Sequence, residues 1–266
     1  MVEKLFSIPF IASGRSLGLI IVVSMFFVIL YLMTLKKEIF IRRIAGLDAI
    51  EEAVGRAAEM NKPVICSYGV AQTGFDHFTL AGLAILARVA ELTAKTGTRL
   101  IVPTGGSDQS LPTRPIAEEI VKTAYTMAGR PEAFTPNDIP FLTGQQYPYT
   151  GGYVGIIQRV KPAAIISVGS HSNENLNIVD TGRSIGAITI ANCHSITNTT
   201  IVACAADYFL IGEEVMAAAA YLSNDVSQKA CIKCQDVFKV IAIILMVVGI
   251  SLTSLGNDLV KSFLMS

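Results

Sequence analysis

The sequence predicts an α/β domain with a mostly parallel, three-layer, Rossmann-like sheet, flanked by an N-terminal and a C-terminal transmembrane helix. Short β-branched runs alternate along the middle of the chain with longer stretches of helical apolar spacing, which is typical of a parallel sheet covered by helices. These runs are apolar throughout rather than alternating, as in strands that are buried on both faces. Two further apolar runs, each nineteen residues long, lie near the two ends of the chain.

The composition excludes several classes of protein. Only 16% of the 266 residues are charged and 52% are hydrophobic, whereas an ordinary soluble domain has about 25% charged residues. Such a chain is neither disordered nor an acidic tail. The 21 Lys and Arg residues balance 21 Asp and Glu residues without a basic block. This argues against a nucleic-acid partner, because binding phosphates requires a cationic face.

The first apolar run, residues 17–35, predicts an uncleaved membrane anchor. It contains no charged residue, and a helix of this length matches the hydrocarbon thickness of a bilayer. A cleaved signal peptide would need a small-residue cleavage site after the run. The run is followed instead by the basic residues Lys36, Lys37, Arg42 and Arg43.

The second apolar run, residues 237–255, predicts a second span. Lys239 lies near its start, where the long side chain can extend to the lipid headgroups. The alternative is a buried or interface-lying helix that packs against the first anchor.

The positive charges predict how these spans are oriented. Six basic residues flank the runs on the central side, namely Lys36, Lys37, Arg42, Arg43, Lys229 and Lys233. Three flank them on the outer sides, namely Lys4, Arg15 and Lys261. By the positive-inside rule the middle of the chain is cytoplasmic and both termini are external. The predicted organisation at the cell membrane is an external tail, a span, a cytoplasmic α/β domain, a second span and an external tail, at residues 1–16, 17–35, 36–236, 237–255 and 256–266.

The elements of the central domain follow from the spacing of apolar residues. Helices are predicted at residues 45–60, 78–95, 113–127, 145–160, 173–183 and 213–222. Strands are predicted at residues 63–68, 99–102, 139–142, 162–168, 187–190, 199–203 and 207–211. The last two strands are too close for a crossover helix, so they are predicted to form an antiparallel hairpin.

Polar residues gather where the predicted strands end, and in open α/β sheets binding sites lie beyond the carboxyl ends of the strands. The loops there are rich in Gly, hydroxyl and amide residues and contain two of the three histidines. The sequence therefore predicts a candidate small-molecule site formed by Gly105, Gly106, Asp108, Ser170, His171, Asn192 and His194. The alternative is that these residues only shape the loops, with Gly in turns and Ser or Asn at helix N-termini.

Catalytic and cofactor motifs are missing from the sequence. There is no G-x-x-x-x-G-K-[ST] loop, no G-x-S-x-G elbow and no H-E-x-x-H pair. The glycines Gly151, Gly152 and Gly155 lack the spacing of a dinucleotide fingerprint and lie in a predicted helix. His171 and Glu174 are spaced to share a metal ion, but no third ligand is near in sequence. No catalytic residue, metal or cofactor is therefore expected.

The five cysteines are an odd number without framework spacing, which argues against a disulfide scaffold. Cys231 and Cys234 form the one Cys-x-x-Cys sequence, and Lys229 and Lys233 lie beside them. They are candidate redox thiols, because nearby cations lower the pKa of a thiol. The alternative is a pair of free thiols at the membrane interface, since no second Cys pair is available to complete a zinc site.

Several stretches together resemble an uncharacterised family of prokaryotic membrane-anchored proteins that is known only as a domain of unknown function. They read RRIAGLDAIEEAVGRAAEMNKPV, LAGLAILARVAELTAKTGTRLIVP, PIAEEIVKTAYTMAGRPEAF, FLTGQQYPYTGGYVGIIQRVKPAA, TGRSIGAI and ADYFLIGEEVMAAAAYLS. The resemblance covers residues 42–236 and the flanking anchors, and it implies the same architecture without an activity or catalytic residues. In the family the loop after the 162–168 strand is more apolar and lacks the sequence Gly169-Ser170-His171, which argues against a catalytic His171.

The preferred functional hypothesis is a non-enzymatic scaffold that self-associates or holds a membrane protein complex at the lipid bilayer. It rests on the missing catalytic motifs, the Ala-rich apolar helices and the low charge, which is typical of surfaces covered by other subunits. The alternative is a membrane-bound enzyme or small-ligand sensor that uses the loops at the strand ends.

Overall fold

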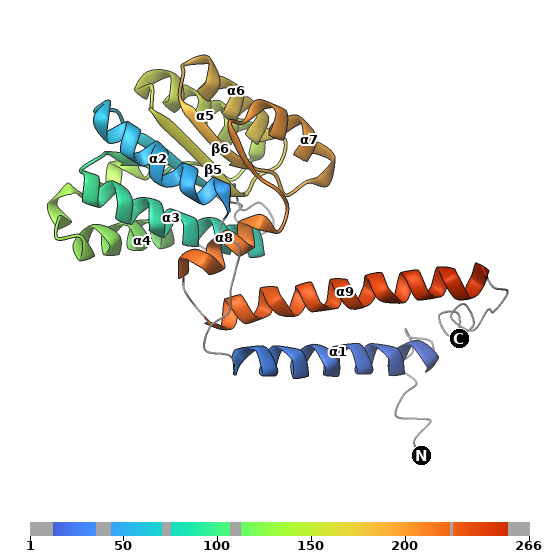
Figure 1. Cartoon of the computed structure of the whole chain (residues 1–266). Coiled ribbons are helices and arrows are strands. Elements are labelled where there is room, and N and C mark those ends of the chain that lie inside the picture. Colours follow the sequence, from blue (N-terminus) through green and yellow to red (C-terminus); the bar gives the residue numbers. More distant parts are fainter. Residues whose placement is uncertain (1–12, 36–43, 71–75, 107–112, 224–225, 255–266) are drawn as a thin grey trace. The chain divides into compact units, whose positions relative to one another are not determined.

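The computed structural model describes residues 13–35, 44–70, 76–106, 113–223 and 226–254 of the chain (Figure 1). The chain divides into two compact units. One is a central α/β domain of residues 42–224, and the other contains the two long terminal helices, α1 (Ser13–Thr34) and α9 (Val226–Ser254).

The main sheet of the central domain has five strands, and all its strand pairs are parallel. The order is β2-β1-β5-β6-β7, with bounds Leu100–Ile101, Val64–Gly69, Ala164–Ser170, Ile188–Asn192 and Tyr208–Leu210. If the five strands of this sheet are numbered 1 to 5 in chain order, their spatial order is 2-1-3-4-5. This is one of the two common doubly wound arrangements, and it differs from the Rossmann order 3-2-1-4-5-6. The direction of winding changes between β1 and β5, so ligands are expected at the carboxyl ends of these two strands.

Helices cover both faces of this sheet (Figure 1). Alternate side chains of β1 enter different cores, with Val64 and Cys66 in one and Ile65 in the other. One face carries α2, α3, α4 and α8, with bounds Ala45–Glu59, His77–Thr96, Thr113–Met127 and Glu214–Ser223. The other carries α5, α6 and α7, with bounds Gln146–Val160, Glu174–Ser184 and Ile196–Ala205. The predicted layered α/β domain with a mostly parallel sheet is confirmed.

The six helices predicted for the central domain are found within one residue at each end. The strand predicted at residues 199–203 is wrong, because this stretch lies inside the helix α7. The predicted antiparallel hairpin is wrong too, since β7 pairs with β6 in parallel. Fifteen residues separate β6 from β7, which is sufficient for a crossover with a short helix. The β-branched residues of α7 favour a strand locally. In the folded domain the segment is helical instead, and Val202 is buried between this helix and the sheet.

A second, two-stranded sheet pairs β3 (Thr104–Gly105) with β4 (Phe141–Thr143) in parallel. Two short 3-10 turns, Pro131–Ala133 and Pro136–Asp138, precede β4. The sequence analysis predicted β4 but ended the preceding strand at Pro103. The chain pairs again directly after this proline, because the amide nitrogen of Thr104 donates to the carbonyl oxygen of Pro140 at 2.9 Å.

In the terminal unit, α1 and α9 pack against each other and run in opposite directions (Figure 1). The rings of Phe26 and Phe238 lie 5.8 Å apart, and the Cys234 thiol donates to the carbonyl oxygen of Phe26 at 3.6 Å. Within the described residues, two helices are long and apolar enough to cross a membrane, α3 and the stretch Val226–Ser251 of α9. The α3 window is 56% buried and belongs to the core of the α/β domain, whereas the α9 window is only 6% buried.

Candidate functional site

The carboxyl ends of β1 and β5 approach each other so closely that only glycine fits there. Gly69 has a φ of 105° and Gly169 a φ of 140°. A Cβ atom on Gly69 would lie 2.2 Å from the carbonyl oxygen of Ser170, and one on Gly169 would lie 2.1 Å from that of Tyr68. The amide of Val70 also donates to the Ser170 carbonyl at 3.3 Å. The switch point of the sheet is therefore closed by backbone packed on backbone.

Two buried asparagines hold β5 to β6 at the same edge. The side chain of Asn192 accepts from the amide of Gly169 at 2.8 Å and donates to its carbonyl at 3.0 Å. The side chain of Asn175 donates to the carbonyl oxygens of Ser167 and Asn192, at 3.1 and 2.6 Å. These amides continue the hydrogen bonding between the strands at the point where β6 ends, and each satisfies backbone groups that are shielded from water.

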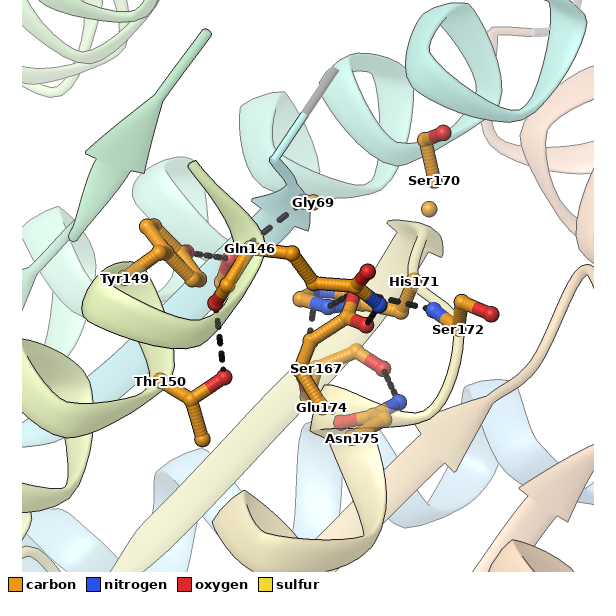
Figure 2. A network of polar contacts seen from close by, with 12 residues as sticks. Gly69, Gln146, Tyr149, Thr150, Ser167, Ser170, His171, Ser172, Glu174 and Asn175 are labelled. Carbon is orange, nitrogen blue, oxygen red and sulfur yellow. Dashed lines mark hydrogen bonds and ion pairs between the residues drawn. The ribbon is translucent and has the colours of Figure 1, made fainter. Parts of the chain in front are cut away.

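Ser167 and His171 form the centre of this network (Figure 2). The hydroxyl of Ser167 donates to Oδ1 of Asn175 at 2.6 Å and lies 3.1 Å from Nε2 of His171. Because this hydroxyl already gives its proton to Asn175, the network assigns the donor role to Nε2 of the imidazole. Nδ1 then lies 3.5 Å from Oε1 of Glu174.

Glu174 is a buried carboxylate that three groups stabilise. Burial acts to raise its pKa, but the contact with His171, the backbone amide of Ser172 and the side-chain amide of Gln146 together lower the pKa from 4.5 to about 2. The Ser172 amide donates to Oε1 at 2.8 Å, and Nε2 of Gln146 donates to Oε2. Since Gln146 begins α5 and Glu174 begins α6, this charge joins two helices at the strand edge (Figure 2).

A second buried polar contact joins β1 to α5. The hydroxyl of Tyr149 lies 2.7 Å from Oγ of Ser67 and donates to the carbonyl oxygen of Pro103 at 3.2 Å. Ser67 in turn accepts from the amide of Gly69 at 3.3 Å. Burial raises the pKa of Tyr149 far above its ordinary value of 10.0, so this phenol stays neutral. Its hydroxyl links α5 to Ser67 of β1 and to the carbonyl oxygen of Pro103.

The rim of the site is formed by Asp76, Ser170 and His194. Oδ1 of Asp76 caps α3 by accepting from the amide of Thr79 at 2.6 Å, and Oδ2 accepts from the Ser170 hydroxyl at 3.0 Å. Nδ1 of His194 lies 2.7 Å from the carbonyl oxygen of His171 and donates to it.

An aromatic residue separates the two exposed imidazoles of the rim. The ring of Phe78 lies 4.6 Å from that of His77 and 6.0 Å from that of His194. Both histidines are exposed, whereas His171 is completely buried. Solvent therefore reaches the rim but not the Ser167–His171–Glu174 centre.

The sequence profile of a domain of unknown function, DUF6754, matches residues 8–264. The chain belongs to this family. No curated protein and no solved structure matches it. The match confirms the resemblance to an uncharacterised family, and it extends over the central domain and both terminal helices of this DUF6754 protein.

The candidate residues predicted for this DUF6754 protein separate into three groups. Ser170, His171, Asn192 and His194 come together at the carboxyl edge of the main sheet. Gly105 lies in the small sheet, where an added Cβ atom would lie 2.9 Å from atoms of both Thr143 and Tyr149. The next residue, Gly106, is buried. Asp108 lies outside the described residues.

The sequence analysis missed Ser67, Asp76, Gln146, Ser167 and Asn175. Ser67 and Ser167 carried a signal, because each serine lies in the middle of an otherwise mostly apolar strand, VICSYG or AIISVGS. Among the described residues, no group of three or more His, Cys, Asp or Glu side chains is placed to hold a metal ion.

The candidate thiols lie on α9, away from the sheet in sequence. Cys234 is buried against the carbonyl oxygen of Phe26, and Cys231 is half-buried, with Nε2 of Gln235 donating to its sulfur at 3.9 Å. Both are free thiols. Their spacing places them on one turn of a helix that packs on α1, rather than at a strand-to-helix turn as in thioredoxin-type sites.

Proposed function

We propose that this protein is a membrane-anchored scaffold whose two terminal helices hold a cytoplasmic α/β domain at the cell membrane, where copies of the chain associate. The observation that carries this proposal is the uncovered apolar half of α9. Eight large side chains are each between 45% and 68% exposed there, namely Val240, Ile243, Ile244, Leu245, Met246, Val247, Val248 and Ile250. Burying such a side chain is worth roughly 1.5–3 kcal/mol, so a bilayer is the natural surroundings of this segment.

The burial of the polar centre supports a scaffold over an enzyme. A general base has to come within hydrogen-bonding distance of the proton that it removes. His171 is completely buried, Ser167 is held between His171 and Asn175, and Glu174 is engaged by three donors. These groups are well placed to fix the ends of β5 and β6 and poorly placed to meet a substrate.

The orientation of the central domain can be tested with Cys204, which is exposed on α7. In a Cys231→Ser background, Cys204 is the remaining thiol that is not buried. After alkaline carbonate extraction the protein should stay with the membranes. A membrane-impermeant maleimide should label Cys204 only after the cells are permeabilised, and the Cys204→Ser variant should remain unlabelled in both cases. Release by carbonate would contradict anchoring, and labelling in intact cells would contradict a cytoplasmic domain.

A second candidate is a sensor that binds a small anion at the rim of the site. It is favoured by the two exposed imidazoles that flank Phe78 at the switch point. The test is thermal unfolding of the detergent-solubilised full chain with inorganic phosphate. Anion binding should raise the midpoint in the parent protein and not in the His77→Ala/His194→Ala double variant. Equal shifts in both proteins would dismiss a site at this rim.

A further inference from the structure

A pocket of about 390 Å³ lies beside the amino end of β2, whereas the candidate functional site lies at the carboxyl ends of the strands. One wall of the pocket is formed by the end of α3 and the start of β2. The other wall is formed by α4 and the loop that follows it, residues 130–139. Small-molecule sites have volumes of about 300–1,000 Å³. The pocket is therefore large enough for a small ligand.

The loop that forms one wall of the pocket is held in place by proline, backbone and side-chain contacts. Pro131 and Pro136 each begin a 3-10 turn, and the proline ring fixes φ there. The carbonyl oxygen of Asp138 accepts from the amide of Val102 at 2.8 Å. The carboxylate of Asp138 accepts from Nη2 and Nε of Arg99 at 2.6 and 3.1 Å, and it raises the pKa of this arginine. The pocket is therefore preformed, and these two charges neutralise each other.

Arg130 places a guanidinium group across the pocket. Its backbone amide donates to the carbonyl oxygen of Tyr125 at 3.0 Å, directly after Gly129, which has a left-handed φ of 74°. The guanidinium reaches the opposite wall, where a Cβ atom on Gly97 would lie 2.7 Å from Nη1. Among the described residues, no side chain or backbone group bonds to this guanidinium. Its N–H donors are therefore available to a ligand, and their fork matches the two oxygens of a carboxylate.

The rest of the pocket combines one hydroxyl group with apolar surface. The hydroxyl of Tyr125 donates to the carbonyl oxygen of Thr98 at 3.5 Å, which is the long limit of a hydrogen bond. Burial raises the pKa of Tyr125, so this hydroxyl stays protonated and can donate to a ligand. The apolar surface comes from Ala94, Leu100, Val121, Phe134 and Ile139. This combination suits a molecule with an anionic end and an apolar body.

We propose that this pocket binds a small organic acid, with its carboxylate on Arg130 and its apolar body between Tyr125 and Phe134. A guanidinium binds a carboxylate through two parallel hydrogen bonds, and aromatic rings cover apolar surface well. Glu132 also lines the pocket and is exposed, so the charge suits a monoanion better than a phosphate dianion. The inference does not depend on membrane anchoring, because every residue that carries it lies in the central domain.

The fluorescence of a single tryptophan tests where the acid binds. The chain contains no tryptophan, so Phe134→Trp supplies a reporter in the pocket. Tyr147→Trp is the matched control, because Tyr147 is 78% exposed on α5. The solubilised full chain is titrated with 3-phenylpropionate. The emission of Phe134→Trp should change with a dissociation constant of about 1 mM, which is ordinary for a ligand of this size. The emission of Tyr147→Trp should stay constant, and equal changes in both variants would overturn the site.

The role of the charge is tested in the Phe134→Trp background. Arg130 is exposed, so Arg130→Gln should leave the near-ultraviolet circular dichroism unchanged while it weakens binding about tenfold or more. Lys122→Gln removes an exposed cation of α4 outside the pocket and should leave the affinity unchanged. The neutral 3-phenylpropanamide should bind about tenfold more weakly than the acid. Equal affinities for acid and amide, an unchanged affinity in Arg130→Gln, or no response of Phe134→Trp well above the expected dissociation constant would each overturn the proposal.

Discussion

The carboxyl edge of the sheet and the terminal helix pair differ in the side chains that they bury and expose. At the sheet edge, polar side chains from β1, β5, α5 and α6 satisfy one another inside the domain. In the helix pair, large apolar side chains stay exposed between Val22 and Leu32 of α1 and between Val240 and Ile250 of α9. Most polar groups of the first region have partners inside the domain, whereas the exposed apolar groups of the second need either lipid or protein to cover them. We therefore expect the helix pair, rather than the sheet edge, to contact lipid or other proteins.

The largest effect is expected where β1 meets β5. Gly169→Ala would place a Cβ 2.1 Å from the carbonyl oxygen of Tyr68, at a φ of 140°. The free energy of unfolding should fall by about 4 kcal/mol, from overlap and backbone strain together. Near-ultraviolet circular dichroism of the tyrosines during denaturant unfolding measures this in the solubilised full chain.

The matched control for that substitution is Gly129→Ala. Gly129 also has a positive φ, 74°, but a Cβ there meets nothing within 4 Å. The expected cost is about 1 kcal/mol from the left-handed conformation alone. Similar losses for Gly129→Ala and Gly169→Ala would show that the two strand ends are not tightly packed.

The next effect is a pH dependence carried by Glu174. Its folded pKa of about 2 lies below the ordinary 4.5, so the unfolded chain binds a proton more readily than the folded one. The associated stability is present above about pH 5 and is lost as the pH falls toward 2, by about 3 kcal/mol in all. Glu174→Gln should flatten the curve of unfolding free energy against pH over this range.

Glu132→Gln is the control for the titration, because Glu132 is an exposed carboxylate on a surface turn. Its curve should follow that of the parent protein. If the parent and Glu174→Gln curves coincided instead, the buried carboxylate would not be charged in the folded domain.

A somewhat smaller loss is expected from Asn192→Ala. The substitution removes two hydrogen bonds to Gly169 and leaves its amide and carbonyl without a side-chain partner in a buried place. The cost should be about 2–3 kcal/mol. Asn177→Ala, on the exposed side of α6, should change the free energy of unfolding by less than about 0.5 kcal/mol. An equally small effect of Asn192→Ala would contradict a stabilising role of its two hydrogen bonds to Gly169.

The smallest effect on the α/β domain is expected from Ile244→Arg on α9. Ile244 is 55% exposed, so the arginine displaces no core, and the tyrosine dichroism should report unchanged unfolding. A charge at the middle of a spanning helix costs about 2.5–3.5 kcal/mol of insertion, so membrane retention after carbonate should fall. Val226→Arg, at the polar start of the same helix, is the control and should be retained. Loss of domain stability in Ile244→Arg would show that the two regions are coupled.

Much of the fold could be predicted from the sequence because its signals are local. The helices from α2 to α8, apart from α7, end where glycines or changes of periodicity indicate, and β1 and β5 read as apolar runs. The helix α7 was missed because Thr199, Thr200, Ile201 and Val202 favour a strand when neighbours are ignored. In the folded domain Val202 and Ala205 pack against the sheet one helical turn apart, and this packing is not visible in the local sequence.

The site was harder to predict because its members are distant in sequence. Ser170 and His171 follow a clear strand, but Asp76 pairs with Ser170 from 94 residues away and Gln146 reaches Glu174 over 28 residues. Strand order decides which loops become neighbours, and the apolar runs alone do not encode it.

The central claim is that the apolar half of α9 is covered by lipid while the sheet domain is complete in itself. A scan with single nitroxide labels at Val240, Ile244 and Val247, in the full chain reconstituted into vesicles, tests this directly. Relaxation by dissolved oxygen should dominate at all three positions, and relaxation by a water-soluble nickel chelate should dominate at a label on the exposed Asn177. Nickel accessibility along α9 equal to that at Asn177 would contradict the claim.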